Sequence, residues 1–323
     1  MDGRAELIAD QGAAAESDDF FRSRAFYDAE GVTHTLRVES PAGDASVPVL
    51  VNEIAGTEGM LDAISPYGYP GASLEAGATR LDPGAVDWSA IGLVSVFLRD
   101  RIGHQPFLAN ATRRSAVQIH DPSKKRNLRS RFADQIRRNE RLGYHIEVLS
   151  GPNTSTEQRT SFHALYIETM RRRDAEERYF FDPDYLAGVL RFERSWLVLC
   201  RSPEGSTAAG AIAAVSDGLL HYYLGGTAEA HLRDSPFKNV AAGMMALTEE
   251  LESRLNLGGG VWRGDGLEDF KRGFANAELP FWTHEIVCDP AAYERLSEGR
   301  SDSGFFPLYR APAAAEAGAT RPT

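Results

Sequence analysis

The chain has 323 residues, of which 25% are charged and 42% hydrophobic, and its formal net charge at pH 7 is −11. These values are those of a soluble globular protein long enough for two domains. Only two cysteines, Cys200 and Cys288, are present, which excludes a disulfide framework. Residues 1–19 lack the features of a signal peptide, and no apolar segment is long enough to span a bilayer, so we expect a cytoplasmic protein.

The charge is unevenly distributed along the chain. Between Arg101 and Ser150 there are eleven Lys and Arg against four Asp and Glu, whereas the remainder is strongly acidic. Acidic surface disfavours non-specific binding to nucleic acid, while a local basic strip can still hold a few phosphates. The distribution favours contact with one end of an RNA and excludes a chromatin or genomic DNA binder.

The hydrophobic pattern predicts alternating strands and helices, which indicates an α/β or α+β fold. Before Gly151 we predict strands over 33–39, 47–54, 92–98, 116–120 and 145–149 and a helix over 123–142. Beyond it come helices over 156–172, 183–190 and 236–255 and strands over 196–200, 208–215, 219–224, 260–262 and 281–287. Because the second half repeats the first in kind, we predict domains over 1–150 and 151–310 and a disordered tail over 311–323.

The loop Asp62–Gly71 holds Tyr67 and Tyr69 among two prolines and two glycines. Proline fixes φ, and glycine permits backbone conformations that other residues avoid, so both tyrosines would be displayed from a stiff segment. Such a loop suits a binding site. The alternative is a surface turn whose tyrosines half-bury against a sheet.

The predicted helix over 123–142 carries the basic block. Leu128, Phe132 and Ile136 recur at every fourth position and would face the core. A helical projection gives an outer face rich in arginine, formed by Arg126, Arg129, Arg137 and Arg141. These arginines could contact phosphates; the alternative is a solvated helix surface with an ion pair between Asp134 and Arg138.

A further candidate lies near the C-terminus, where a glycine-rich stretch leads to a helical turn with Lys271 between Phe270 and Phe274. Phenylalanines four positions apart share a helix face and anchor it in a core, which places the lysine at the edge of that face. A partly buried lysine is unfavourable without an anionic partner. It is therefore either a lysine that reaches water or a cation fixed where negative charge develops.

Five segments, in their order and spacing, resemble the FemABX family of aminoacyl-tRNA-dependent transferases and the wider FemAB-like acyltransferases. They are the Ser65–Pro70 turn, the Lys124–Arg129 helix start, the Phe162–Arg173 helix, the Tyr179–Phe181 run and the Phe270–Phe274 turn. The resemblance covers most of the chain. It implies mixed α/β sheets in two tandem acetyltransferase-type (GNAT) domains with a cleft between them.

The resemblance also implies a reaction, the transfer of an amino acid from aminoacyl-tRNA to an amine, without a cofactor. Lys271 matches the family's lysine and would stabilise the oxyanion of the tetrahedral intermediate. Candidates to accept the amine proton are Asp100, at a strand end, and Asp265, in a Gly-Asp-Gly turn. Their alternative roles are an ion pair of Asp100 with Arg99 or Arg101 and turn stabilisation by Asp265. The substrate or the tRNA leaving group could carry the proton instead.

The acceptor implied by the family is peptide-like, either a peptidoglycan precursor or a peptide antibiotic intermediate. We expect it to be bound by Ser65, Tyr67, Tyr69, Arg172, Arg173, Tyr223 and Asp265. Exposed helix arginines and a core or cleft-wall tyrosine are the alternatives. The arginine-rich helix would hold the tRNA, and we expect a monomer. The histidines lack zinc-ligand spacing, so no metal site is predicted.

The alternative donor is acyl-CoA or a carrier-protein thioester. GNAT enzymes that use CoA generally cradle its pyrophosphate in a glycine-rich turn at a helix N-terminus. The stretch 230–239 has no glycine, and Ser235 before Pro236 predicts an N-cap and an ordinary helix start. This disfavours CoA. A third possibility is a noncatalytic tandem-GNAT protein that binds RNA or a peptide.

Overall fold

The computed structural model describes residues 3–9, 17–260, 262, 264–301 and 304–311. They form two compact units: unit 1 is drawn from residues 1–13, 32–114 and 282–323, and unit 2 from 14–31 and 115–281. This division differs from the boundary expected near Gly151. Helix α2 (Ser130–Leu142) packs on α5 (Phe237–Glu250), and strand β9 (His145–Ser150) pairs with β10 (Ser195–Arg201), so the segment before Gly151 is part of unit 2.

Unit 1 is built on a sheet in the order β6-β1-β2-β3-β4-β7-β14. These strands are β1 (Gly3–Ile8), β2 (His34–Glu39), β3 (Ala45–Glu53), β4 (Leu61–Ile64), β6 (Val86–Asp87), β7 (Leu93–Arg99) and β14 (Ala277–Val287). The short β5 (Ser73–Leu74) pairs with β3, and α7 (Pro290–Ser297) follows β14. Alternate residues such as Leu36, Val38, Val47 and Val49 are buried and form its core, as the period of a strand requires.

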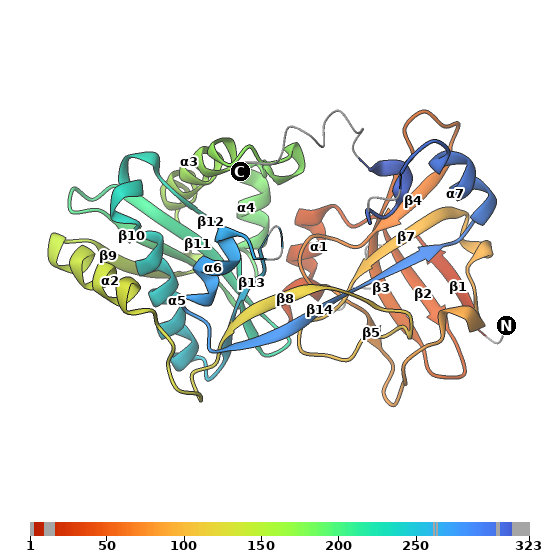
Figure 1. Ribbon diagram of the computed structural model, residues 1–323, viewed down its shortest axis with the longest axis horizontal. Helices are drawn as coiled ribbons and strands as arrows, with labels where there is room; N and C mark the ends of the chain where they lie inside the picture. Colours follow the sequence, from red (N-terminus) through yellow and green to blue (C-terminus); the bar gives the residue numbers. More distant parts are fainter. Residues whose placement is uncertain (1–2, 10–16, 261, 263, 302–303, 312–323) are drawn as a thin grey trace. The chain divides into compact units, whose positions relative to one another are not determined.

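Unit 2 is built on a sheet in the order β8-β13-β12-β11-β10-β9. The further strands are β8 (Thr112–His120), β11 (Thr207–Ser216), β12 (Leu219–Thr227) and β13 (Arg254–Gly258), and the other helices are α1 (Arg24–Glu30), α3 (Thr156–Arg172), α4 (Pro183–Val189) and α6 (Gly266–Arg272). Ala209 and Ala211 belong to the core under α5, whereas the backbone of Gly210 lies against Phe162 of α3. Because successive strand residues face opposite sides, α3 and α5 cover opposite faces of this sheet (Figure 1).

Some predicted elements differ from those of the structure. Helix α2 begins at Ser130, because residues 121–129 form turns and irregular backbone. The helix predicted over 236–255 ends at Glu250, and the strand predicted over 260–262 instead lies at β13, residues 254–258. Ser235 is not an N-cap: it is left-handed, with φ 47°, and its hydroxyl donates to the carbonyl of Leu232. The predicted tail lies, from residue 312 on, outside the described residues. No described helix is sufficiently long and apolar to cross a membrane.

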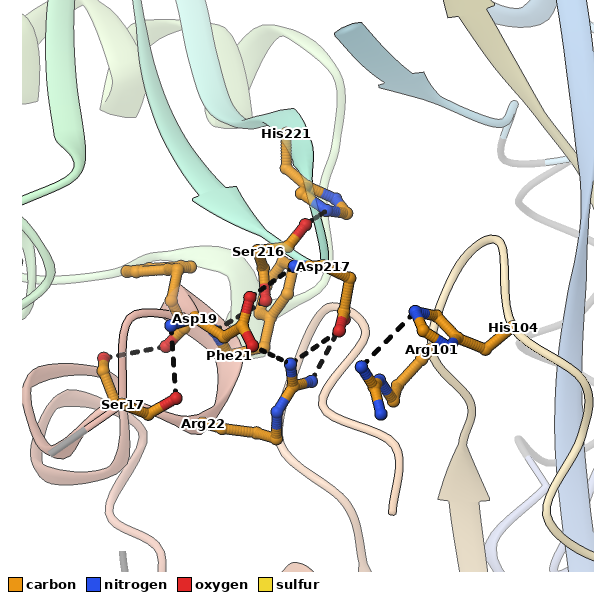
Figure 2. A network of polar contacts seen from close by, with 11 residues as sticks. Ser17, Asp19, Phe21, Arg22, Arg101, His104, Ser216, Asp217 and His221 are labelled. Carbon is orange, nitrogen blue, oxygen red and sulfur yellow. Dashed lines mark hydrogen bonds and ion pairs between the residues drawn. The ribbon is translucent and has the colours of Figure 1, made fainter. Parts of the chain in front are cut away.

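The N-terminal segment of unit 2 is held by a fully buried aromatic cluster and an ion pair. Phe20, Phe21 and Phe26 each have no exposed surface. Arg22 donates to Asp217 at 2.6 and 3.0 Å and to Asp19 at 2.5 Å (Figure 2). Asp217 stands in the turn between β11 and β12, so these contacts fix the segment before α1 against that turn.

Candidate functional site

Strands β12 and β13 of unit 2 pair over only part of their length. They run parallel from Leu219 opposite Arg254 to His221 opposite Asn256, after which β12 continues along β11 to Thr227. At this last pair the amide of Asn256 donates to Nδ1 of His221 at 3.0 Å. Burial lowers the pKa of His221 to about 4, so the ring is neutral. The pair therefore fixes the point at which the two strands separate.

Lys271 of α6 lies at this separation. Its Nζ donates to the carbonyl of Gly259, just after β13, at 2.6 Å, and it stands 5.6 Å from the ring centre of Tyr222 on β12. The residue is only 7% exposed, which is more burial than the sequence predicted. Burial lowers its pKa to about 8, against the attraction of Asp265. At neutral pH the site holds a fixed ammonium group.

The two phenylalanines anchor this lysine as predicted. Phe274 is fully buried, and its ring centre lies 5.0 Å from that of Phe132 on α2. Phe270 lies 5.6 Å from the same ring. The backbone of Gly273 passes so close to Phe132 that an added Cβ would lie 2.1 Å from its ring. Helix α6 is therefore held tightly against α2, and the position of Lys271 follows from this packing.

Asp265 has the turn-stabilising role that was the alternative to accepting the amine proton. It is the N-cap of α6, where its carboxylate accepts hydrogen bonds from the backbone N–H of Glu268 at 2.7 Å and of Trp262 at 2.9 Å. The same carboxylate attracts the ammonium group of Lys271. Asp265 therefore shapes the loop that presents the lysine, and its contact with an acceptor remains a prediction.

The four predicted tRNA contacts lie on or just before α2. Arg126 is exposed in the irregular segment that precedes the helix, and Arg141 is exposed at its end. Arg129 makes two bonds to Asp269 of α6, at 2.6 and 2.8 Å. Arg137 pairs with Asp134 at 2.5 Å. The predicted ion pair of Asp134 with Arg138 is wrong. Arg138 instead lies 3.6 Å from Asp234, and Asp134 pairs with Arg137, because an i,i+3 neighbour on a helix is as near as an i,i+4 neighbour.

In unit 1 the predicted acceptor loop follows β4. Ser65 is 1% exposed, and its hydroxyl accepts from the backbone N–H of Arg99 at 2.9 Å, which joins the ends of β4 and β7. Tyr67 is exposed and Tyr69 half-buried. Gly71 has φ 55°, and a Cβ there would lie 2.8 Å from the backbone nitrogen of Arg101. The predicted need for glycine is confirmed; the binding role remains a prediction.

Asp100 directly follows β7, as predicted, but its partner is a residue that the sequence did not indicate. Its carboxylate accepts from Nε2 of His284 on β14 at 2.8 Å and from the backbone N–H of Arg101 at 3.2 Å. Asp100 is 3% exposed, and His284 is fully buried. This geometry favours a structural role within unit 1 over that of a general base.

The remaining predicted residues lie at the end of α3 and on β12. Arg172 of α3 donates to the carbonyl of Thr227 at 3.1 Å, and Arg173 is exposed at the end of the same helix. Tyr223 is 7% exposed, and its hydroxyl donates to Glu30 at 3.0 Å. Glu30 and Tyr185, which also contacts Tyr223, were not predicted, because these positions are far apart in sequence and share no motif. Unit 2 thus brings Lys271, Arg172 and Tyr223 to one strand, β12.

Residues 126–272 match the family model described as "Acetyltransferase (GNAT) domain". This part of the chain is similar to a GNAT domain. The matched residues lie within unit 2 and include α2, β12 and Lys271. No curated protein sequence matches the chain.

Solved structures extend the likeness beyond the GNAT domain. The C-terminal domain (DUF2156) of a putative lysylphosphatidylglycerol synthetase from Agrobacterium fabrum has a TM-score of 0.56 and 16% identity, covering 86% of this chain and 89% of that one. FemX has a TM-score of 0.53 and 11% identity, covering 81% and 89%. L-PGS from Bacillus licheniformis has a TM-score of 0.53 and 15% identity, covering 82% and 90%. The predicted mixed α/β fold of GNAT type is confirmed.

Proposed function

We propose that the protein transfers an aminoacyl group from aminoacyl-tRNA to an amine of a peptide-like acceptor and forms an amide. The observation that carries this proposal is the buried ammonium group of Lys271, held between Gly259 and Tyr222 where β12 and β13 separate. Two structural neighbours support it: FemX, and the C-terminal domain of a putative lysylphosphatidylglycerol synthetase, a name that denotes a lysyl-bearing product.

The proposed reaction depends mainly on holding the amine and the ester in position and on a fixed positive charge near the carbonyl, and less on a strong acid or base. The amine nitrogen attacks the ester carbonyl, a C–N bond forms, the C–O bond to the tRNA ribose breaks, and one proton passes from nitrogen to the departing oxygen. Negative charge develops on the carbonyl oxygen in the transition state. Lys271 uses one of its three N–H groups on Gly259, which leaves donors for that oxygen. Because its pKa is about 8, it carries charge at neutral pH.

The donor assignment rests on two features of unit 2. Arg126, Arg137 and Arg141 are exposed on one segment, and they would hold tRNA phosphates in a salt-dependent manner. The loop before α5 fits CoA poorly: the carbonyl of Asp234 accepts from the side chains of Gln135 and Asn139, and its carboxylate accepts from Tyr144 at 3.0 Å. A carboxylate at a helix start opposes a pyrophosphate there. A FemAB-like N-acyltransferase with acyl-CoA or a carrier-protein donor is the alternative.

The test is transfer from radiolabelled aminoacyl-tRNAs to a panel of peptide amines, with acetyl-CoA in parallel. Lys271→Ala should lower kcat by about 10²–10³, the effect of removing one oxyanion donor. Lys238→Ala is the matched control, since Lys238 is a lysine of α5 that also lies over an aromatic ring, that of Phe132 at 4.9 Å, and it should retain activity. Transfer from acetyl-CoA alone would refute the donor, and full activity of Lys271→Ala would refute the role of the lysine.

A further inference from the structure

Two bulky apolar side chains near the lysine site are displayed to solvent. Trp262, in the loop between β13 and α6, is 73% exposed, the largest exposed fraction of any bulky apolar side chain among the described residues. A tryptophan normally buries most of its ring, because the ring carries a large apolar surface. Leu267, in the first turn of α6, is 41% exposed. We call Trp262 and Leu267 the apolar rim.

The backbone of Trp262 is anchored at both of its polar groups. Its N–H donates to the carboxylate of Asp265 at 2.9 Å, and its carbonyl accepts from the N–H of Asp265 at 3.2 Å. A Cβ on Gly260 would lie 2.7 Å from that carbonyl, so the chain passes close to it. Because Asp265 is also the N-cap of α6, the indole ring is displayed from a turn that is fixed to the helix carrying Lys271.

The apolar rim adjoins the ammonium group of Lys271. Trp262 follows Gly259, whose carbonyl accepts from that group, by three residues, so the Cα atoms of Trp262 and Gly259 lie within about 11 Å of each other. Leu267 lies four positions before Lys271 in α6, so the two side chains share one face of the helix. This face is open to solvent at Leu267 and closed one turn later at Lys271.

Positive charge lies beside the apolar rim. Arg129, just before α2, and Arg131, in its first turn, approach the carboxylate of Asp269 at 2.6 and 3.6 Å. Asp269 follows Leu267 by two positions in α6. Two guanidinium groups share this one carboxylate, so a net positive charge remains, and the side chain of Arg131 is 68% exposed. An exposed aromatic ring beside arginines suits the end of an RNA strand, with a base on the ring and phosphates on the cations.

The short distance from Gly259 to Trp262 favours one particular nucleotide. In aminoacyl-tRNA the ester is carried by the ribose of the 3′-terminal adenosine, so a single sugar separates this adenine from the reacting carbonyl. In CoA a pantetheine arm and a pyrophosphate stand between the adenine and the thioester. A ring within about 11 Å of the group that binds Lys271 therefore suits the terminal adenosine of tRNA better than the adenine of CoA.

We propose, on the basis of the proposed function, that Trp262 stacks on the adenine of the 3′-terminal adenosine of the donor and that Leu267 packs against the same nucleotide. The stacked base holds the ester beside Lys271 before the amine attacks. This contact is the same before and during the reaction, so its loss raises KM and leaves kcat nearly unchanged. Trp262 thus differs in its kinetic effect from Lys271, whose loss lowers kcat.

The test uses the full-length protein, aminoacyl-tRNA and a semisynthetic aminoacyl-tRNA whose 3′-terminal nucleotide lacks its base. Trp262→Ala should raise KM for the intact donor about 5- to 150-fold, the range for one base stacked on an aromatic ring, and Trp262→Phe should raise it far less. With the abasic donor, wild type and Trp262→Ala should have the same KM. Leu232→Ala is the matched control, because Leu232, in the loop before α5, is also 41% exposed and should affect neither constant.

A binding measurement does not depend on transfer. Uncharged tRNA should quench the tryptophan fluorescence of wild type. The quenching should be largely lost in Trp262→Phe, and also in wild type when the tRNA lacks its terminal adenosine. CoA should quench neither chain, and quenching by CoA but not by tRNA would overturn the inference.

The kinetic results separate this inference from the proposed function. If Trp262→Ala lowers kcat as Lys271→Ala does, the turn only holds the lysine, and the inference is overturned. An equal rise of KM with intact and abasic donors would overturn it as well. Transfer from tRNA with an unchanged KM in Trp262→Ala would leave the proposed function standing without this contact. If wild type transfers only from acetyl-CoA, the proposed function fails, while quenching by uncharged tRNA still decides the role of Trp262.

Discussion

Lys271 combines charge with burial, and the two oppose each other energetically. Burial lowers its pKa from the ordinary value of 10.5 to about 8 in the folded chain, against the attraction of Asp265. At pH 7 the group is protonated in the folded and the unfolded chain. As the pH rises the folded chain releases its proton first, so between about pH 8 and 10.5 the free energy of unfolding rises relative to a chain without this lysine.

Lys271→Met should therefore be more stable than wild type at pH 7. The difference should reach up to about 3 kcal/mol, since each pKa unit corresponds to about 1.4 kcal/mol, less the loss of the bond to Gly259. It should shrink steadily as the pH rises past 8. Urea unfolding of both chains at pH 7, 8.5 and 10 measures this. A difference that does not change with pH would mean that methionine acts through packing alone.

Arg22 gives a second prediction at the scale of one residue. Its guanidinium group and the carboxylate of Asp217 have only 9% and 2% of their side chains exposed. Removing one partner of a buried pair leaves the other charge uncompensated, so Arg22→Met should lower the free energy of unfolding by about 3–5 kcal/mol. Arg24→Met removes an exposed pair with Asp28 in the same segment and should cost about 0.5 kcal/mol or less. Equal effects in urea unfolding would contradict this account of the segment.

Local spacing was enough to predict some site residues and not others. Lys271 could be found because Phe270 and Phe274 lie four positions apart and mark a helix face within one turn. The partner of the predicted Tyr223 could not be found in this way, because Glu30 is 193 positions away in the sequence. Contacts of this kind depend on tertiary packing, which a single sequence does not display.

The packing of α6 on α2 is the contact between elements that positions the lysine. Gly273 allows it, because a Cβ there would lie 2.1, 2.7 and 2.9 Å from ring atoms of Phe132. Phe132 is 4% exposed and cannot move into solvent without opening the core. Gly273→Ala should therefore cost about 1–3 kcal/mol by overpacking and should also lower transfer activity, because α6 must shift.

Gly266 provides the matched control for this prediction. It is the first residue of α6, and no atom lies within 4 Å of the position that a Cβ would take. Gly266→Ala should be neutral or slightly stabilising, since alanine is the better helix former. Thermal unfolding of both variants measures the difference. A loss of stability as large as that of Gly273→Ala would show that the contact with Phe132 is not what limits substitution in α6.

The sequence predicted regular elements well where their period was long and uninterrupted. Helix α3 has the predicted limits, 156–172, because its capping Ser155 and its buried face both mark them. Strand β13 was predicted too far along the chain, because the turn after α5 was not recognised. That turn contains Glu252 with φ 48°, a left-handed conformation that is uncommon for glutamate and so is not predicted from the sequence. Helix α1 and strand β4 are too short to give a clear period and were missed.

At the scale of the whole molecule, the two units draw on interleaved parts of the chain. Residues 115–281, together with 14–31, make up unit 2, while unit 1 takes segments from both sides of them. A division into consecutive halves was therefore a reasonable reading of element order but not the division that the contacts show. The order of elements along a chain does not determine which of them share a core, because a short terminal segment can pack into the core of either unit.

The N-terminal residues should accordingly stabilise both units, by separate contacts. Strand β1 pairs with β2 in unit 1, with Ala5 1% exposed, whereas Phe20, Phe21 and Phe26 are fully buried in unit 2. Each such phenylalanine is worth about 3–5 kcal/mol, and their sum is comparable to the whole stability of a domain. Deleting residues 1–9 should raise hydrogen exchange in β2 while β11 and β12 stay protected. Deleting residues 1–31 should abolish protection in β11 and β12 as well. Unchanged exchange of these strands in the longer deletion would mean that unit 2 folds without its N-terminal segment.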